Sequence, residues 1–437
     1  MSTPIADSRE PASISIVPIL SVNFVGTLGF SIVLPFMVFL VTKWGGNAIV
    51  YGVLASTYSF FQLLGAPLLG KWSDRYGRRK ILLLSQLGTL LSWLIFLTAF
   101  VLPTDALLEI DSSTLGQFTL TLPLLVLFAA RATDGLTGGN VSVANAYLAD
   151  ITDDAHRSEN YGRMAVSTNV GFIAGPALAG LLGATVHGEI LPVATALLVS
   201  FVATLLIGFG LRESRPVALA TDPQTPNACK VFGQETKECF VRHCEALSNR
   251  DILRLPQIPA LLGINFLVML GFSVFYIAFP THAATRLDWQ VTDTGAYFAT
   301  LSLFMVVVQG PLLSRLSKKL SDTVLIVGGS LALGAGFAFL LSDDTTMIYA
   351  AALLIALGNG LMWPTFMAVL SRRAEGRVQG AVQGFASSLG AAASIVGLIS
   401  GGLLYTWMGA WVFAVPAAIT VCVALLAFAT AAPQPAD

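Results

Sequence analysis

The stretch Gly70-Lys-Trp-Ser-Asp-Arg-Tyr-Gly-Arg-Arg-Lys80 decides the fold of this chain. Five cations are gathered in it, and uncharged runs at residues 44–70 and 81–104 flank it. A helix needs about 20 apolar residues to cross about 30 Å of hydrocarbon, because it rises about 1.5 Å per residue. We therefore predict that residues 70–80 form a polar loop between two membrane-spanning helices.

The whole chain has the composition of a membrane protein. Of its 437 residues, 55% are hydrophobic and only 11% are charged, whereas a soluble domain carries about a quarter charged residues. The last uncharged run is long enough for two crossings, with a turn expected near Gly401-Gly402 and Trp407-Met408-Gly409. Because backbone groups must be paired in lipid, we predict an all-α polytopic membrane protein with twelve transmembrane helices, located in the runs 11–42, 44–70, 81–104, 112–149 (interrupted), 164–186, 190–211, 255–281, 294–314, 323–342, 345–371 and 378–436.

The longest polar segment, about residues 213–256, divides the chain into two similar halves. Pro67-Leu-Leu-Gly-Lys71 recurs as Pro311-Leu-Leu-Ser-Arg315, and Asp134-Gly-Leu136 recurs as Asn359-Gly-Leu361. Chance recurrence is the alternative to duplication. Two six-helix bundles related by an axis along the membrane normal imply a cavity between them and alternating access by rocking. The predicted parts are a disordered cytoplasmic N-terminus 1–14, a bundle 15–212, a central cytoplasmic loop 213–256, a bundle 257–431 and a cytoplasmic tail 432–437.

The distribution of cations predicts the orientation. Lys43 and Arg286 are the cations expected on the outer side, where the loop between the third and fourth spans holds Asp105, Glu109 and Asp111. The positive-inside rule then places both termini in the cytoplasm. We expect the protein itself to reside in the cell membrane. The cations of the predicted cytoplasmic loops are Arg75, Arg78, Arg79, Lys80, Arg157, Arg163, those between residues 212 and 254, Arg315, Lys318, Lys319, Arg372, Arg373 and Arg377.

Three motifs carry a family resemblance. The first is the stretch 70–80, and the second is Arg131-Ala-Thr-Asp-Gly-Leu-Thr-Gly-Gly-Asn140, which continues to Ala144-Asn-Ala-Tyr-Leu-Ala-Asp150. The third is Gly171-Phe-Ile-Ala-Gly-Pro-Ala-Leu-Ala-Gly180. They cover nearly the whole first half, with weaker support in the second. In these motifs the chain resembles the major facilitator superfamily, and within it the twelve-span drug/proton antiporters related to tetracycline efflux proteins.

The residues of the first motif are expected to control the conformational cycle. Gly70 and Gly77 permit a tight turn and close helix approach, and Asp74 stands where it can cap a neighbouring helix. The resemblance implies that this helix is span eleven and that arginines of the loop pair with Asp150. The alternative is a cluster of cations that only sets topology. The predicted gating residues are Gly70, Asp74, Arg75, Gly77, Arg78, Arg79 and Asp150.

The third motif is expected to be a packing device in the fifth span. Gly171, Gly175 and Gly180 are small residues that leave a groove for another helix. Pro176 removes a backbone donor and should bend the helix. Only the resemblance links this motif to antiport rather than symport.

Arg131 and Asp134 are the charged residues expected deep inside a span. Ionisable groups there are costly and should face a cavity or a partner, and a spacing of three puts both on one helix face. Burial favours the neutral form of the carboxyl group, whereas the guanidinium favours its charged form. We predict that Asp134 exchanges the coupled proton and that Arg131 tunes the proton affinity of its carboxyl group. A permanent structural ion pair is the alternative.

Other polar and aromatic residues within the spans are candidates for an aromatic, weakly polar cavity that suits amphipathic compounds. Helix–helix hydrogen bonding is the alternative for each. The first span, about residues 15–41, lacks the carboxylate that related tetracycline antiporters carry there, which argues against naming tetracycline as the substrate. The candidate lining residues are Asn23, Tyr58, Gln62, Asn169, Asn265, Tyr276, Asn359 and Trp363.

Together these features favour a monomeric secondary transporter that exports small organic molecules in exchange for protons. A symporter or facilitator of sugars or similar solutes is the runner-up, and a transport-dead sensor or scaffold is the alternative from another class. We find no nucleotide loop, nucleophile elbow or HExxH motif, so no enzyme, cofactor or metal is expected. Nucleic-acid binding needs a basic face that the sequence lacks.

Overall fold

The computed structural model describes residues 15–33, 36–138, 140–152, 157–183, 185, 188–214, 249–373 and 379–431. The expectations for the N-terminus 1–14, for most of the central segment 213–256 and for the tail 432–437 lie outside these residues. Within them, helices lie in each of the twelve predicted spans. Nine segments are long and apolar enough to cross a membrane, and one of them, Phe385–Thr430, contains two helices.

The first half contains eight helices and one hairpin among its described residues. The first span contains the two helices α1 and α2, and a break at Gly138 separates the two helices of the fourth span. The elements are α1 (Val17–Ser31), α2 (Met37–Lys43), α3 (Ala48–Tyr76), α4 (Arg78–Thr98), a 3₁₀ turn (Ala99–Val101), β1 (Ala106–Ser112), β2 (Gly116–Thr121), α5 (Leu122–Thr137), α6 (Asn140–Ile151), α7 (Arg157–Gly183), α8 (Ile190–Leu205) and a π-helical turn (Leu206–Gly210).

The second half repeats the helical pattern without a hairpin in its described residues. Its elements are α9 (Asn249–Ile252), α10 (Ile258–Thr285), α11 (Val291–Val307), a π-helical turn (Val308–Leu312), α12 (Leu313–Leu316), α13 (Asp322–Phe339), α14 (Thr345–Arg373), α15 (Gln379–Met408), a 3₁₀ turn (Gly409–Phe413) and α16 (Ala414–Ala431).

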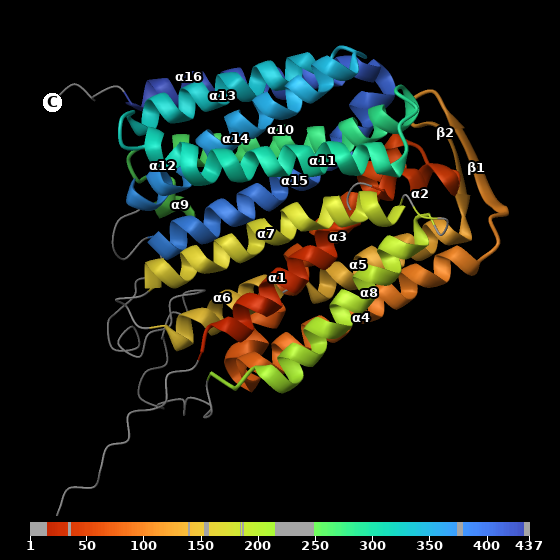
Figure 1. Cartoon of the computed structure of the whole chain (residues 1–437), viewed down its shortest axis with the longest axis horizontal. Helices are drawn as coiled ribbons and strands as arrows, with labels where there is room; N and C mark the ends of the chain where they lie inside the picture. Colours follow the sequence, from red (N-terminus) through yellow and green to blue (C-terminus); the bar gives the residue numbers. More distant parts are fainter. Residues whose placement is uncertain are drawn as a thin grey trace, which may run out of the picture.

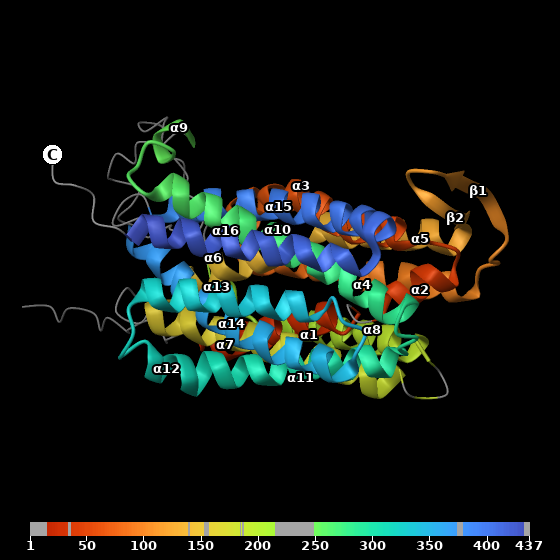
Figure 2. The same cartoon turned by 90° about the horizontal axis from the view of Figure 1, so that it is seen from above.

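The two halves form two helical bundles that lie side by side (Figures 1 and 2). Each half has its own apolar core, with side chains such as Trp93 and Phe96 in the first and Phe279 and Phe337 in the second. The β1–β2 hairpin marks one end of the molecule, which we call the hairpin end (Figure 1). The junction of α3 and α4 lies at the opposite end, which we call the junction end. The prediction of an all-α polytopic fold is confirmed apart from this hairpin.

Equivalent glycines support duplication of the two halves. A Cβ atom on Gly135 of α5 would collide with the backbone of α3 at Tyr58. In the second half, a Cβ atom on Gly360 of α14 would lie 2.7 Å from Cγ1 of Val308, in the π-helical turn that continues α11 within the eighth span. The fourth and tenth spans therefore pack closely on the second and eighth spans through the same position of the repeated motif.

Glycines also bring the two bundles together near the hairpin end. Helix α15 crosses α3, where a Cβ atom on Gly402 would collide with the carbonyl group of Ala48 and lie 3.0 Å from Cα of Ile49. Helix α7 crosses α11, where a Cβ atom on Gly180 would lie 3.2 Å from Cα of Gly295. At both crossings the backbones approach as closely as small residues permit.

One expected loop is helical in the structure, and the turn expected near residues 401–409 is found at the last of them. The predicted loop 70–80 is helical except for one residue: α3 continues through Gly70 to Tyr76, and α4 begins at Arg78. Only Gly77, with φ of 100°, makes the turn. In the second case α15 continues through Gly401 and Gly402, because these glycines serve helix packing, and the chain turns at Gly409 with φ of 56°.

The hairpin is an element that hydropathy did not predict. Its two strands pair antiparallel between α4 and α5. The backbone N–H of Thr119 donates to the carbonyl oxygen of Gly45 over 2.8 Å. In the turn between the two strands, the carbonyl oxygen of Thr114 accepts from the indole N–H of Trp407 in α15 over 3.0 Å. The hairpin therefore connects the first half with the last turn of α15 in the second half.

Candidate functional site

The charged pair of the fourth span lies inside the first bundle. Arg131 and Asp134 are each about 5% exposed, and Nη1 of Arg131 donates to Oδ2 of Asp134 over 3.3 Å. Both belong to α5, which begins at Leu122 with a proline in its first turn. The predicted interaction across one helical turn is present in the structure.

Aromatic rings surround the guanidinium group. Its central carbon lies 4.6 Å from the ring centroid of Tyr58 and 5.7 Å from that of Phe30. Gln62 donates to the hydroxyl of Tyr58 and to the carbonyl oxygen of Gly138, both over 3.0 Å. Cation–π contacts of this kind stabilise a charged guanidinium away from water. The guanidinium of Arg131 thus contacts two aromatic rings besides its acid partner.

Asp134 faces a small cavity of about 30 Å³. Five helices of the first half (α1, α3, α4, α5 and α8) contribute to its wall. A cavity of this size holds about one water molecule and needs polar partners to do so. The polar part of the wall consists of Asp134, Tyr58, Thr89, Gln86 and Ser200. The carboxyl group therefore has a polar space beside it, as a group that exchanges a proton requires.

Three polar groups of this wall were not predicted from the sequence. Gln86 is buried and donates to the hydroxyl of Ser200 over 2.7 Å, which links α4 to α8. Thr89 lies next to the carboxyl group of Asp134. Amides and hydroxyls in a span resemble ordinary helix–helix contacts, so no local signal distinguishes them.

The structure does not bring the other predicted lining residues to this cavity. Asn23 of α1 donates to Thr168 of α7 over 2.7 Å, and Asn265 of α10 donates to the carbonyl oxygen of Ala386 over 2.8 Å. These are helix–helix contacts. Of the remaining candidates, Asn359 contacts Met305, Trp363 packs beside Phe366, Tyr276 stacks on Phe298, and the side chain of Asn169 lies outside the described part of the chain.

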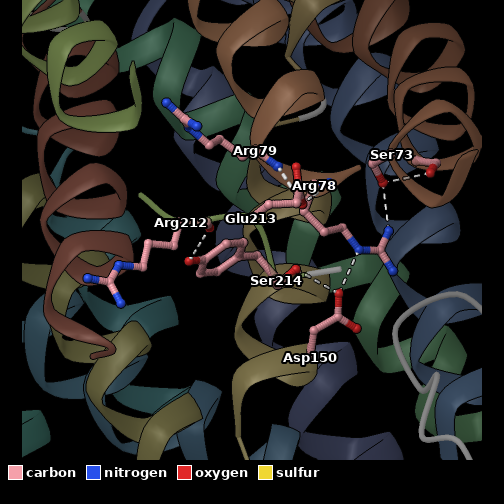
Figure 3. A network of polar contacts seen from close by, with 9 residues as sticks. Ser73, Arg78, Arg79, Asp150, Arg212, Glu213 and Ser214 are labelled. Atoms are coloured by element: carbon pink, nitrogen blue, oxygen red, sulfur yellow. Dashed lines mark hydrogen bonds and ion pairs between the residues drawn. The ribbon is translucent and has the colours of Figure 1, made fainter. Parts of the chain in front are cut away.

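A second polar cluster lies at the junction end (Figure 3). Nε of Arg78 lies 3.0 Å from Oδ2 of Asp150, and both side chains are about 5% exposed or less. Nη1 of Arg78 donates to the hydroxyl of Ser73 over 2.6 Å, while the hydroxyl of Ser214 donates to the same carboxylate oxygen over 3.1 Å. The pair of Arg78 with Asp150 joins α4 to α6. The side chains of Asp74 and Arg75 are outside the described set.

Glu213 completes this cluster and was not predicted as a site residue. Its Oε1 accepts from the backbone N–H groups of Arg78 over 2.8 Å and Arg79 over 3.3 Å, so it caps the start of α4 (Figure 3). The guanidinium of Arg79 donates to the carbonyl oxygens of Gly208 and Ile207. The chain that follows α8 is therefore bound to the α3–α4 junction.

We expect that the substitution Glu213→Ala lowers the stability of the protein by about 1–2 kcal/mol. The change removes an acceptor from two N–H groups at a helix start, where the helix dipole also favours an anion. Thermal unfolding of the purified protein in detergent measures the loss. Glu109→Ala, which removes an exposed acid of the hairpin, is the control and should leave the transition in place. An unchanged transition for Glu213→Ala would contradict the capping role.

The glycines of the fifth span lie on two faces of α7. Cβ atoms on Gly171 and Gly175 would contact α1 at Thr27 and Ser31, respectively, while Gly180 contacts α11 in the other half. The helix continues through Pro176 without ending. These glycines thus let α7 pack closely on one helix of each half.

Comparisons with known proteins agree with these features. The profile of the Major Facilitator Superfamily matches residues 19–258 and 261–437. The chain is 31% identical over 388 residues to the class G tetracycline resistance protein of Vibrio anguillarum, covering 86% of this chain and 87% of that protein. It is 26% identical over 394 residues to multidrug resistance protein 2 of Bacillus subtilis, covering 89% and 88%.

Solved structures show the same fold. The human organic anion transporter MFSD10 (TETRAN) superposes with a TM-score of 0.64 at 20% identity, covering 96% of this chain and 100% of that one. The D-xylose-proton symporter superposes with a TM-score of 0.72 at 14% identity, covering 95% and 97%. The sequence match along nearly all of the chain, together with two packed helical bundles, shows that this protein is a membrane transporter of the Major Facilitator Superfamily.

Proposed function

We propose that this transporter exports small amphipathic organic compounds in exchange for protons. The observation that carries the proposal is the buried carboxyl group of Asp134, which lies beside both a cation and a small polar cavity. Relatives along the whole chain are tetracycline and multidrug resistance proteins. An ionisable group inside a span supports a role in ion coupling.

The proposed cycle is a rocking motion of two bundles, residues 15–212 and 257–431, in a monomer. In this structure the bundles contact each other near the hairpin end through Gly402 and Gly180. The cation-rich junction end faces the cytoplasm in the proposal, since cations favour that side. The hairpin end then faces outward, both termini are cytoplasmic, and the protein resides in the cell membrane. The ion pair of Arg78 with Asp150 is proposed to control the motion: it holds one arrangement of the cytoplasmic end and breaks during the cycle.

Everted membrane vesicles with an acidic interior provide the test. A pH-sensitive dye reports the gradient while lipophilic and polar compounds are added one at a time. We expect that some amphipathic compound collapses the gradient in vesicles that carry the protein and not in vesicles that lack it. Uptake of the compounds without proton movement would overturn antiport and identify a facilitator. Uptake accompanied by protons in the same direction would identify a symporter.

A further inference from the structure

A buried histidine lies near the hairpin end of the second half. His282 is 1% exposed and stands in the last turns of α10. Its Nδ1 lies 3.4 Å from the hydroxyl of Tyr405 in α15, and its Nε2 lies 3.5 Å from Oδ1 of Asp343, which is in the segment between α13 and α14. Neither the motifs nor the proposed role of Asp134 uses this histidine.

Hydrogen-bond direction determines which ring nitrogen is free. The hydroxyl of Thr285 donates its single proton to the carbonyl oxygen of Thr281 over 2.7 Å. The hydroxyl of Tyr405, 2.9 Å from that of Thr285, must then donate to it. The oxygen of Tyr405 is left as an acceptor. In the neutral ring of His282, Nδ1 therefore carries the proton and donates to Tyr405, and Nε2 carries a lone pair.

The nitrogen with this lone pair lies 3.5 Å from a carboxylate oxygen. Nε2 of His282 is buried and makes no hydrogen bond to any described residue, and the nearest carboxylate oxygen belongs to Asp343. A proton on Nε2 would convert this contact into a charge-assisted interaction. Histidine is the side chain whose ordinary range of titration lies near physiological pH. A proton on Nε2 would thus lie beside a carboxylate oxygen, which offsets the cost of placing a charge on a buried ring.

The groups around the ring come from four elements. Arg286 of α10 donates from Nε to Oδ2 of Asp343 over 3.1 Å, so the carboxylate is already held in place on its other side. Tyr405 is the neighbour from α15, and the turn before α16 contributes the uncharged ring of Phe413, 5.4 Å away. Arg286 opposes a positive charge on His282, and Asp343, 3.5 Å from Nε2, favours it. Because Asp343 is about half exposed, protons can reach the pair from solvent.

The last turn of α15 connects this pair to the other half. Tyr405 faces His282, while Trp407, two residues later, donates to the hairpin at Thr114. Residues two apart on a helix point in opposite directions. Gly402, one turn earlier, is where α15 crosses α3 of the first half. Tyr405 therefore shares one helix segment with the two contacts that close the hairpin end, those of Trp407 and Gly402. If Tyr405 shifts, both contacts are affected.

We propose that Nε2 of His282 is a second proton-binding site, whose occupation closes the outward face of the transporter. The added proton strengthens the contact of His282 with Asp343 and stabilises the position of Tyr405 beside the ring. The last turn of α15 then keeps its hydrogen bond to the hairpin at Thr114. This stabilisation is present while His282 is protonated and is lost as the pH rises. The outward assignment rests on the proposed function, in which protons enter from the hairpin end and must precede closure of that end.

The test measures distance across the hairpin end in the purified protein. Spin labels are placed at Ser113 in the hairpin turn and at Thr346 in the second half, both exposed, after the four native cysteines are replaced by serine. We expect the fraction with the short distance to rise about fivefold from about pH 8 to about pH 5.5. His282→Gln should abolish this response.

Two further variants keep the test decisive. Asp343→Asn removes the counter-charge at a half-exposed position and should also lose the response, even if His282→Gln fails to fold. Asp288→Asn is the matched control: it removes an exposed acid at φ of 52°, a conformation that asparagine tolerates, and should respond like the wild type. A wild type without pH response, or a persistent response in Asp343→Asn, would overturn the inference.

The distance readout separates this inference from the proposed function. It requires neither a transported compound nor proton exchange. If vesicles exchange protons for a compound but the distance ignores pH, the histidine inference alone fails. If the distance follows pH and no compound moves protons, the proposed antiport alone fails.

Discussion

Replacing Asp134 by asparagine is expected to reduce proton-coupled transport by about 100-fold or more. Asparagine has nearly the same size and accepts from Arg131 through its amide oxygen, so the fold around the cavity should persist. It cannot release or bind the coupled proton. The dye assay in everted vesicles, with a compound that the wild type exchanges, measures the loss.

The control for this experiment is Asp111→Asn. Asp111 is an exposed acid of the hairpin, whose carboxylate accepts from Gln117 at the surface, and its removal should leave coupled transport intact. Binding of the compound should survive in Asp134→Asn, because only proton transfer is removed. Full coupled transport by Asp134→Asn would show that the pair with Arg131 is purely structural.

Replacing Gly402 by alanine is expected to shift the protein away from the arrangement in which the hairpin end is closed. The added Cβ atom would collide with the carbonyl group of Ala48, which belongs to the backbone and cannot rotate away. Overpacking of this kind costs about 1–3 kcal/mol. Because the crossing joins the two halves, the cost falls on the closed arrangement and changes its population by about 5- to 150-fold.

The labels at Ser113 and Thr346 measure this shift as a longer distance, and transport should fall with it. Gly263→Ala in α10 is the matched control, since nothing lies within 4 Å of its added Cβ atom. An unchanged distance distribution in Gly402→Ala would mean that the α3–α15 crossing is not part of closure.

Local patterns predicted the charged pair of the site correctly. The spacing of Arg131 and Asp134 is enough to place both on one face of a helix, because helix geometry is set within a single turn. The same reasoning did not find Glu213, although an acid after a span is visible in the sequence. Its partners are the N–H groups at the start of α4, which are more than a hundred residues away in the chain. Nothing local indicates that contact.

Hydropathy did not predict where the helices end near residues 70–80. The cations of 70–80 suggested a loop, yet these residues extend two helices up to Gly77. Polar residues are compatible with a helix at a membrane surface, so charge marks the boundary of the lipid and not the end of the helix. The turn expected near residues 401–409 is present at Gly409, whereas Gly402 provides close contact with another helix.

The motifs indicated a transporter only through their resemblance to a known family. What the residues themselves predict is a helical membrane protein with a charged pair inside its fourth span. Such properties depend on composition and on spacings within one helix. Only the tertiary structure decided which polar groups meet: Glu213 with the start of α4, His282 with Asp343, and Trp407 with the hairpin. Membrane helices are apolar on most sides, so their sequences hardly specify how each helix is rotated. Close packing against helices distant in the chain determines that rotation, and with it the site.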